Sequence, residues 1–556
     1  MTLPWAPHYD PGVPLTVEPV TTSVPELLLE AAAKTPQAPA LIFFGRSFTY
    51  RQLAEMAARL AQAFKGQGLA PGERLALLLP NCPQFVVAYH AALRLGAVVV
   101  PLNPLLSAKE LAQQLSNAGA RRLVVLDHLL PKVEEFPGLT HLIVTSLTDV
   151  LPWPLSWLYP LQARRQGLAL GFRAAAGRSA WRALLAQPPL AAAPLPGVED
   201  LAVLLYTGGT TGTPKAARLT HGNLMANVAQ INAWLPSVRF GEERLVGLLP
   251  FAHSFGLTAC LNWPMSQGAQ IIVLPRFELD GFIKMLRKFR PTMLPGVPTL
   301  FVALINDPRL PKLDLSSLWA CISGSAPLPL EVRDRFEALS GCTMMEGYGL
   351  TEAAPVTHFN PVRGRRPVGS MGIPLPSTQA KVVDQETGTR ELPPGEVGEL
   401  VIQGPQVMEG YWRNPEETAL VLKDGWLHTG DLARMDEDGY FYIVERKKDL
   451  IIAGGYKIYP REVEEVLYQH PGVKEAAALG VPHAYRGETV KVVIVPQDGA
   501  GLTAADIEAH CRRLLAVYKV PKIIEFRSEL PKSAVGKVLR RELKEAGDGA
   551  GPAGSP

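Results

Sequence analysis

The chain has 556 residues, of which 47% are hydrophobic and 19% are charged, and its formal net charge is +3. A chain this long exceeds what one hydrophobic core supports, so two or more domains are expected, and the composition is ordinary for a soluble globular protein. The small net charge, without an arginine-rich arm or a nucleic-acid-binding motif, argues against a nucleic-acid partner.

Targeting and redox signals favour a cytoplasmic protein. The five cysteines lie far apart and show neither metal-ligand spacing nor a disulfide framework, which is typical of a reducing compartment. The first twelve residues are proline-rich and do not form a signal peptide. Residues 546–556 are rich in glycine and proline, which predicts a disordered tail.

Helices and strands alternate through the first two thirds of the chain. Residues 51–64 place Leu53, Met56, Ala57, Leu60 and Phe64 on one helical face. Short apolar runs predict buried strands at 74–79, 97–100, 123–126, 141–145, 201–206, 270–274 and 319–323. This alternation predicts a large, layered α/β domain with mostly parallel sheets.

Residues 151–185 interrupt that pattern. They mix five aromatic residues with five arginines and contain no acidic residue: Trp153, Trp157, Tyr159, Phe172, Trp181, Arg164, Arg165, Arg173, Arg178 and Arg182. Aromatic and arginine side chains together suit a membrane interface, so one prediction is peripheral contact with the inner face of a membrane. The competing interpretation is a surface loop packed on the body, with its arginines in water.

The last part of the chain predicts a smaller domain. Strands are expected at 381–383, 399–403 and 440–444, the last after a turn at 436–439. We predict a boundary between residues 447 and 448, which gives an N-terminal domain of residues 1–447 and a mobile C-terminal domain of residues 448–556. The latter is expected to be a small α+β unit, with helices at 461–469 and 504–517 and strands at 475–479, 490–495 and 523–526.

The run Tyr206-Thr207-Gly208-Gly209-Thr210-Thr211-Gly212-Thr213-Pro214-Lys215 follows a predicted strand. Its glycines allow backbone amides to approach an anion, and its hydroxyls and lysine add donors and positive charge. The spacing differs from a Walker A loop, because Thr213-Pro214 separates Gly212 from Lys215. The run therefore predicts a triphosphate site of another type.

Three further groups fit the same nucleotide. Glu346-Gly347-Tyr348-Gly349-Leu350-Thr351-Glu352 offers a flat ring for a base, a hydroxyl and a carboxylate oxygen suited to magnesium. Ser323-Gly324-Ser325-Ala326-Pro327 leaves room for a purine, and Asp431 in His428-Thr429-Gly430-Asp431 can accept both ribose hydroxyls. Ligands of open α/β sheets bind at the carboxyl ends of strands, where the first two groups lie. Taken alone, each group is more often an ordinary turn.

Together with Glu445-Arg446-Lys447-Lys448-Asp449 and Leu530-Pro531-Lys532-Ser533-Ala534-Val535-Gly536-Lys537, these motifs resemble the acyl-adenylate-forming superfamily from about Ser23 to Glu545. That superfamily includes acyl-CoA synthetases, nonribosomal adenylation domains and firefly-type luciferases. The stretches at 320–329, 424–431 and 459–467 and the run Gly410-Tyr411-Trp412 are most similar to bacterial long-chain fatty-acid–CoA ligases.

The resemblance implies a role for each matching residue. Thr207 and Glu352 would lie near magnesium, and Lys537, Thr351, Glu352 and His253 would form the catalytic group, with His253 at the acyl pocket. The nucleotide and CoA would be held by Thr207, Gly208, Gly209, Thr210, Thr211, Gly212, Lys215, Ser325, Ala326, Pro327, Glu346, Gly347, Tyr348, Gly349, Asp431, Arg446, Lys448, Gly454 and Gly455. Of these, Lys448 matches the family's hinge, and Gly454 and Gly455 match the part that admits the pantetheine arm.

The implied reaction activates a fatty acid with ATP and Mg²⁺ to acyl-AMP and pyrophosphate, and then transfers the acyl group to coenzyme A. Lysines and magnesium would offset the repulsion between the carboxylate and the phosphates. The alternatives are a medium-chain or aryl acid–CoA ligase, an acyl-AMP ligase that loads a carrier protein, a catalytically silent binding protein and a luciferase-like oxygenase. A homodimer is a further expectation of this resemblance.

The chain also departs from the family's pattern. Ala216 follows the loop lysine where glycine is common, which is tolerated unless its φ is positive. Ser325 replaces a common glycine, Glu445 replaces a commoner aspartate, and Leu257 stands where some long-chain enzymes have a gating tryptophan. None of these changes removes a group that the chemistry requires.

Overall fold

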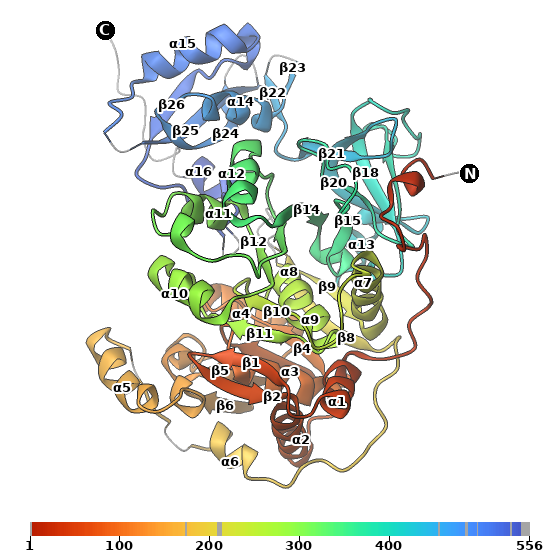
Figure 1. The fold of residues 1–556 in the computed structure, drawn as a ribbon, viewed down its shortest axis with the longest axis vertical. Coiled ribbons are helices and arrows are strands. Elements are labelled where there is room, and N and C mark those ends of the chain that lie inside the picture. Colours follow the sequence, from red (N-terminus) through yellow and green to blue (C-terminus); the bar gives the residue numbers. More distant parts are fainter. Residues whose placement is uncertain are drawn as a thin grey trace. The chain divides into compact units, whose positions relative to one another are not determined.

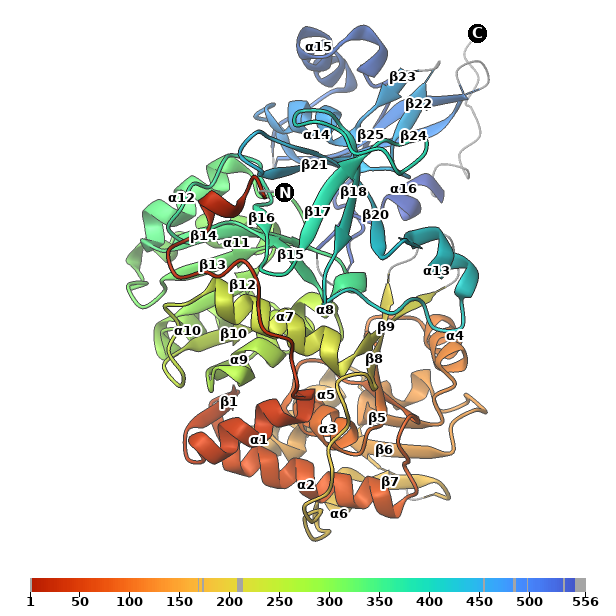
Figure 2. The same cartoon turned by 90° about the vertical axis from the view of Figure 1, so that its right-hand side faces the viewer.

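The computed structural model describes residues 3–168, 170–172, 175–207, 214–453, 456–483, 487–497, 499–533 and 536–545. The chain forms two compact units, one of residues 1–379 with 402–427 and the other of residues 380–401 with 428–556. Figure 1 and Figure 2 colour the chain from its N-terminus (red) to its C-terminus (blue).

The first unit contains a nine-stranded sheet in the order β16-β15-β14-β13-β12-β10-β11-β1-β2. The strands from β1 to β14 along this path are parallel, whereas β2, β15 and β16 pair antiparallel with their neighbours. Their bounds are β1 Pro39–Phe43, β2 Arg46–Thr49, β10 Arg244–Gly247, β11 Gln270–Val273, β12 Met293–Gly296, β13 Ala320–Ser323, β14 Thr343–Gly349, β15 Val356–Phe359 and β16 Ile373–Pro374.

A seven-stranded sheet in the order β7-β6-β5-β3-β4-β8-β9 completes the strand layers of this unit. All its pairs are parallel except β8 with β9. Their bounds are β3 Arg74–Leu78, β4 Val98–Pro101, β5 Arg122–Leu126, β6 His141–Thr145, β7 Arg178–Ala180, β8 Leu201–Thr207 and β9 Lys215–Thr220.

Helices surround both sheets (Figure 1). The α-helices of this unit are α1 Val24–Lys34, α2 Tyr50–Gly66, α3 Pro83–Arg94, α4 Ala108–Ala118, α5 Leu155–Arg165, α6 Trp181–Leu185, α7 His221–Trp234, α8 Ser254–Leu257, α9 Trp263–Ser266, α10 Leu279–Phe289, α11 Pro298–Ile305, α12 Leu330–Ser340 and α13 Pro415–Val421. A π-helix, η4 (Thr258–Asn262), joins α8 to α9, and a short 3-10 turn, η6, covers Thr351–Ala353.

Local sequence signals explain where these helices begin and end. The Thr49 hydroxyl caps α2 by accepting a hydrogen bond from the backbone N–H of Gln52, and the Gln52 side-chain oxygen accepts one from the backbone N–H of Thr49. Of the five residues on the predicted face of α2, Leu53, Ala57, Leu60 and Phe64 are buried, and Met56 is half-buried. α10, α11 and α12 pack their apolar faces on β10 to β14, forming one buried cluster.

The second unit contains a β-rich section and a small α+β section. β17 (Gln379–Val383), β18 (Gly398–Gln403), β20 (Trp426–Met435) and β21 (Phe441–Arg446) follow one another across a sheet that lies mainly in this unit. β19 (Leu422–Lys423), which belongs to the first unit, pairs with the first residues of β20, Trp426 and Leu427. The α+β section has the strands β22 Ile451–Ala453, β23 Tyr456–Ile458, β24 Val473–His483, β25 Gly487–Pro496 and β26 Ile523–Phe526, and the helices α14 Pro460–Tyr468, α15 Ala504–Leu514 and α16 Arg540–Glu545.

The predicted fold class is confirmed, since layered, mostly parallel sheets and a smaller α+β section are present. β6 and β26 begin and end at the predicted residues, and most other predicted strands differ by one or two. Residues 151–185 differ from a plain surface loop because they contain α5, β7 and α6. None of the described helices is long and apolar enough to cross a membrane.

One buried asparagine links the two sheets of the first unit. Asn81 follows β3, and its Nδ2 donates to the carbonyl oxygens of Gly247, Leu248 and Leu249 at 3.1, 3.3 and 2.8 Å. Its Oδ1 accepts from the backbone N–H of Phe251 at 2.8 Å. The side chain therefore satisfies the backbone where β10 ends and the segment 250–257 begins.

We expect Asn81→Ala to lower the free energy of unfolding of the first unit by about 3 kcal/mol, because it leaves several buried polar groups without partners. Urea unfolding followed by tryptophan fluorescence measures this, since all nine tryptophans lie in the first unit. Asn306→Ala, at an exposed asparagine, is the control and should change stability little. A loss below about 0.5 kcal/mol for Asn81→Ala would show that the link is dispensable.

Candidate active site

The hairpin of β8 and β9 positions the predicted phosphate loop. Thr207 pairs with Lys215 at the end of the hairpin where the chain passes from β8 to β9, and the Thr207 hydroxyl donates to the Lys215 carbonyl oxygen at 3.4 Å. The predicted residues Gly208, Gly209, Thr210, Thr211 and Gly212 lie outside the described residues. Ala216 lies within β9 opposite Tyr206, so its backbone is extended and the replacement of glycine there causes no strain.

Lys215 is paired with a carboxylate from a distant part of the chain. Its Nζ donates to Glu417 Oε2 at 2.6 Å and lies 5.8 Å from the centre of the Tyr411 ring. Glu417 stands in the first turn of α13, where a carboxylate also interacts favourably with the helix dipole. The cationic end of Lys215 is thus held between a carboxylate and an aromatic face.

Glu352 lies beside the same tyrosine. It belongs to η6, directly after β14, and its Oε1 accepts a hydrogen bond from the Tyr411 hydroxyl at 2.7 Å. Burial, and then the charge of Glu352, raise the pKa of Tyr411, so the phenol stays protonated and continues to donate. Within the part of the chain that the structure describes, Glu352 Oε2 has no hydrogen-bond partner.

The segment that carries Tyr411 joins β9 to Glu352. Tyr411 forms a bridge with Ala217, and the Trp412 N–H donates to the Ala216 carbonyl at 2.8 Å. The Met408 N–H donates to the Glu352 carbonyl at 2.8 Å. Sequence reasoning assigned no role to Tyr411 or Glu417, although Gly410-Tyr411-Trp412 belongs to the family resemblance and was a signal for Tyr411.

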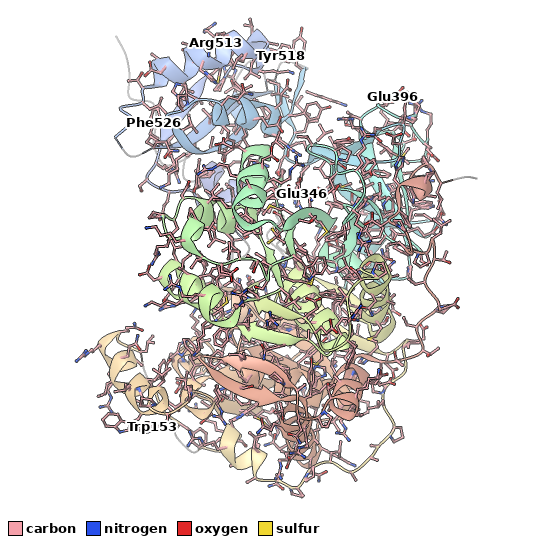
Figure 3. All side chains as sticks on the ribbon, viewed as in Figure 1. Trp153, Glu346, Glu396, Arg513, Tyr518 and Phe526 are labelled. Atoms are coloured by element: carbon pink, nitrogen blue, oxygen red, sulfur yellow. The ribbon has the colours of Figure 1, made fainter. Side chains whose placement is uncertain are left out.

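The predicted purine-binding residues form a turn between β13 and α12. Ser325, Ala326 and Pro327 are exposed there, and Ser325 adopts a φ of 70°, which favours glycine. Glu346, labelled in Figure 3, accepts from the Leu328 N–H through Oε2 at 3.1 Å. This bond ties the end of β14 to the far side of the turn.

Two predicted glycines are required by close packing. A Cβ on Gly347 would lie 2.6 Å from the Phe359 ring, and one on Gly349 would lie 2.1 Å from the Pro355 carbonyl oxygen. Between them, Tyr348 pairs with His358, and their rings are 5.8 Å apart. The glycines therefore let β14 carry Tyr348 close against β15.

The predicted acyl-pocket segment meets the same strand end. His253 caps α8, with its Nδ1 accepting from the Phe255 N–H at 3.3 Å. Next to it, Ser254 Oγ lies 3.1 Å from Thr351 Oγ1. Phe255 also packs on the purine turn, because a Cβ on Gly324 would lie 2.9 Å from its ring. Leu257, at the position of the gating tryptophan, is fully buried.

In the second unit, the predicted ribose-binding residues pair across two strands. Asp431 on β20 lies opposite Arg446 on β21, and Arg446 Nε is 3.3 Å from Asp431 Oδ1. Asp431 is buried. The turn before it is held by Glu399, whose Oε1 accepts from the Gly430 N–H at 3.1 Å.

Lys537 lies in the electrostatic field of this pair. Burial, and then Arg446, lower the pKa of its amine to about 8, while Asp431 and Asp449 oppose the shift and Lys448 adds to it. The backbone around Lys537 is fixed by Ser533, whose Oγ accepts from the Lys537 N–H at 3.2 Å. Gly454 and Gly455 lie outside the described residues.

Arg540 holds the connection after β21 in place. Its guanidinium lies 3.5 Å from Glu445, 3.3 Å from Asp449 and 2.7 Å from Glu464. Glu445 also accepts from the Arg446 N–H and the Arg461 N–H. The longer side chain at position 445 therefore still supports Arg446, and sequence reasoning gave Arg540 no role.

The predicted magnesium ligands fit an ion that arrives with phosphates. Among the described residues, no three or more His, Cys, Asp or Glu side chains are grouped to hold a metal. Glu352 and the Thr207 hydroxyl offer only a carboxylate and a neutral oxygen, and magnesium in phosphate sites is typically bound by one or two carboxylates together with the substrate. The donor set therefore suits Mg²⁺ bound to a nucleotide.

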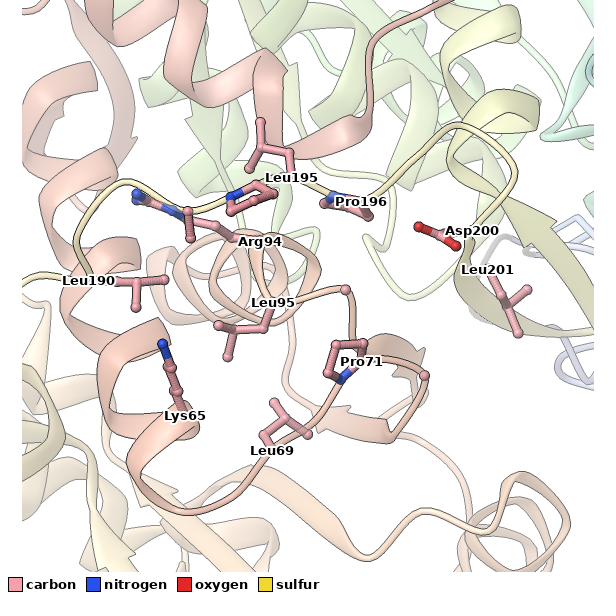
Figure 4. Close-up of a pocket in the computed structure, with 14 residues that line it drawn as sticks. Lys65, Leu69, Pro71, Arg94, Leu95, Leu190, Leu195, Pro196, Asp200 and Leu201 are labelled. Carbon is pink, nitrogen blue, oxygen red and sulfur yellow. The ribbon is translucent and has the colours of Figure 1, made fainter.

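A cavity of about 430 Å³ lies elsewhere in the first unit (Figure 4). It is lined by residues just before β3 and β4 and by the start of β8, including Pro71, Leu95 and Leu201. Ligands of open α/β sheets bind at the carboxyl ends of strands, which is the opposite end of β8, where Thr207 lies. None of the predicted site residues lines this cavity, and we do not assign the chemistry to it.

Two protein-family models and several curated relatives match the chain. The model of the AMP-binding enzyme family matches residues 28–412, and that of the AMP-binding enzyme C-terminal domain matches residues 462–537. A long-chain-fatty-acid–CoA ligase of Bacillus subtilis (strain 168) is 44% identical over 548 residues, which cover 98% of each chain. A ligase of the same name from Escherichia coli O6:H1 is 41% identical over 561 residues, again 98% of each.

Solved structures give the same result. The crystal structure of ATP-bound MatB from Rhodopseudomonas palustris superposes with a TM-score of 0.81 and is 32% identical, covering 94% of this chain and 99% of its own. With a family model spanning most of the chain and relatives above 40% identity along nearly all of it, the chain belongs to the AMP-binding enzyme family.

Proposed function

We propose that this chain is an AMP-forming ligase that activates a long-chain fatty acid with ATP and transfers the acyl group to coenzyme A. The observation that carries the proposal is the meeting of Lys215, Tyr411 and Glu352 at the start of β9, where the chain enters from β8. The Lys215 ammonium lies near the ring of Tyr411 and the Glu352 carboxylate accepts from the Tyr411 hydroxyl, next to the predicted phosphate loop.

The first half-reaction brings a fatty carboxylate to the α-phosphate of ATP. Both groups are anions, so the barrier is mainly electrostatic, and Lys215 and Lys537 are the cations proposed to lower it. Magnesium, held by Glu352 and Thr207 through the phosphates, would supply further positive charge when bound. The carboxylate oxygen forms a bond to the α-phosphorus, and pyrophosphate leaves with the electrons of the bond that breaks.

The remaining residues would hold the nucleotide still. We assign the adenine to the turn at Ser325, Ala326 and Pro327 and to the strand Glu346, Gly347, Tyr348 and Gly349, with Thr351 at the α-phosphate. Asp431 and Arg446 would bind the ribose hydroxyls. Their fixed placement opposite one another across β20 and β21 supports this, because a ribose clamp must not rearrange on binding.

In the second half-reaction, the thiolate of coenzyme A attacks the acyl carbon, a thioester forms, and AMP leaves with its electron pair. We propose that the C-terminal domain, residues 448–556, turns at Lys448 between the two steps and brings Gly454 and Gly455 to the pantetheine arm. His253 is proposed to border the acyl pocket, where Phe251, Phe255 and Leu257 supply buried apolar surface. The five free, buried cysteines suit a reducing cytoplasm, where we place the enzyme.

The proposal is tested by product analysis with acids of rising chain length. With ATP, Mg²⁺ and coenzyme A, long-chain acids should yield acyl-CoA, AMP and pyrophosphate at the highest kcat/KM. Each methylene buried in the acyl pocket contributes about 0.8 kcal/mol, so the preference should rise steeply with length. Highest kcat/KM for medium-chain or aryl acids, or transfer to a holo-carrier protein in preference to coenzyme A, would favour the corresponding alternative.

Lys537 should make adenylation sensitive to alkaline pH. Its amine, with a pKa of about 8, must be protonated to offset the phosphate charge, so we expect kcat/KM for acyl-AMP formation to fall above pH about 8. This pKa lies below the ordinary value of 10.5, so the half-buried ammonium lowers the free energy of unfolding at low pH. That cost disappears as pH rises from about 8 to 10.5. Pyrophosphate exchange as a function of pH measures the first effect.

Lys537→Arg should move the alkaline fall to higher pH, and Lys537→Ala should slow acyl-AMP formation while sparing thioester formation from supplied acyl-AMP. Lys532→Ala, at a lysine of the same segment that pairs with Glu475 at 2.7 Å, is the matched control. An unchanged pH profile in Lys537→Arg, or equal loss of both half-reactions in Lys537→Ala, would contradict the assignment.

Glu417 should compete with phosphate for Lys215. We expect Glu417→Gln to tighten binding of pyrophosphate by about two- to fivefold, since the partly exposed ion pair no longer has to be broken. Isothermal titration calorimetry measures the Kd, and Glu416→Gln, at the exposed neighbour on the same helix, is the control. Weaker binding in Glu417→Gln would mean that the carboxylate orients Lys215 and does not compete with the ligand.

A further inference from the structure

One helix of the first unit presents an apolar face to solvent. α5 projects from the side of this unit (Figure 1), and its only buried residue is Ala163. Tyr159 and Pro160, which are half-buried, lie on the same side of the helix as Ala163. The opposite side carries Trp157, Leu158 and Leu161, all exposed.

This arrangement reverses the usual pattern of a surface helix, whose apolar side faces the protein and whose polar side faces water. The exposed fractions are 85% for Trp153, 70% for Trp157 and 52% for Leu161. Figure 3 labels Trp153 at the edge of the unit, just before α5 begins. We call Trp153, Trp157, Leu158 and Leu161 the α5 apolar face.

Positive charge adjoins this face at the end of the helix. Arg164 and Arg165 occupy the last turn of α5, are exposed, and take part in no ion pair or side-chain hydrogen bond among the described residues. Two other arginines of the segment are already neutralised, Arg178 by Glu134 and Arg182 by Asp149. Favourable interaction with the helix dipole explains cations at this end, but it does not explain two exposed tryptophans.

We propose that the α5 apolar face, with Arg164 and Arg165, docks on the surface of an anionic lipid bilayer. Tryptophan suits the bilayer interface because its ring is apolar and its N–H remains in contact with water. The helix has 11 residues and is therefore about 16 Å long, which is enough to lie in the interface and too short to cross the hydrocarbon core. The two arginines would reach the lipid phosphates.

The positive charge favours a bilayer over a second copy of the chain. In a symmetric dimer through this face, each copy would present the same segment to the other, and residues 151–185 contain no carboxylate to pair with Arg164 and Arg165. An anionic bilayer supplies both an apolar phase and the opposite charge. Docking would also place the first unit at the bilayer, where long-chain fatty acids concentrate. Only this last point rests on the proposed function.

Flotation of the full-length chain with lipid vesicles tests the proposal without using enzyme activity. Wild type should float with vesicles of phosphatidylcholine and phosphatidylglycerol, and much less with phosphatidylcholine alone or in high salt. The double variant Trp153→Ser/Trp157→Ser should weaken partitioning at least about tenfold. Arg164→Gln/Arg165→Gln should weaken it by about fivefold per arginine, and only with anionic vesicles.

Two control variants remove exposed apolar or arginine side chains outside the α5 apolar face. Val517→Ser removes a side chain that is 72% exposed in the second unit, and Arg363→Gln/Arg390→Gln removes two exposed arginines. Both should float like wild type, and all variants should keep wild-type circular dichroism and thermal unfolding. Failure of wild type to bind anionic vesicles, or equal binding by the α5 variants, would overturn the proposal. So would a dimer in analytical ultracentrifugation that the tryptophan variants dissociate.

Discussion

The ion pair between Lys215 and Glu417 is the interaction on which the first-unit site depends. The Nζ–Oε2 distance of 2.6 Å means that the loop lysine is already neutralised by the protein before an anion binds. A phosphate must therefore replace a carboxylate, and binding becomes an exchange between two anions. Such an exchange costs less than leaving a partly buried cation unpaired, and it keeps the lysine from attracting anions indiscriminately.

Tyr411 connects Lys215 to Glu352. Its ring faces Lys215 and its hydroxyl donates to Glu352, so the cation and the proposed metal ligand contact one side chain. The backbone of the same segment pairs with β9 and with η6, which makes the arrangement rigid. In the second unit, Arg540 also links segments that are distant in the sequence. Its contacts with Glu445, Asp449 and Glu464 fix the connection that carries Arg446 and Lys448.

Local chemistry made much of the site predictable. Glycines, hydroxyls and carboxylates placed just after apolar runs indicate strand ends, and Thr207, Glu346 and Tyr348 were predicted from that signal. Asp431, which lies within β20, was predicted from its carboxylate. Tyr411, Glu417 and Asn81 were not, because their partners are 59, 202 and up to 170 residues away and nothing in their neighbours indicates a pairing. The helix α5 was also missed, since its internal proline and outward apolar side hide the usual helical pattern.

The central claim is that a fatty carboxylate attacks the α-phosphate of ATP, so that one of its two oxygens stays on AMP when the acyl group moves to coenzyme A. Fatty acid labelled with heavy oxygen in its carboxylate tests it directly, with mass spectrometry of the nucleotide after thioester formation. The account predicts that AMP carries one labelled oxygen in its phosphate and that pyrophosphate carries none. Label in inorganic phosphate together with ADP, or unlabelled AMP, would contradict it.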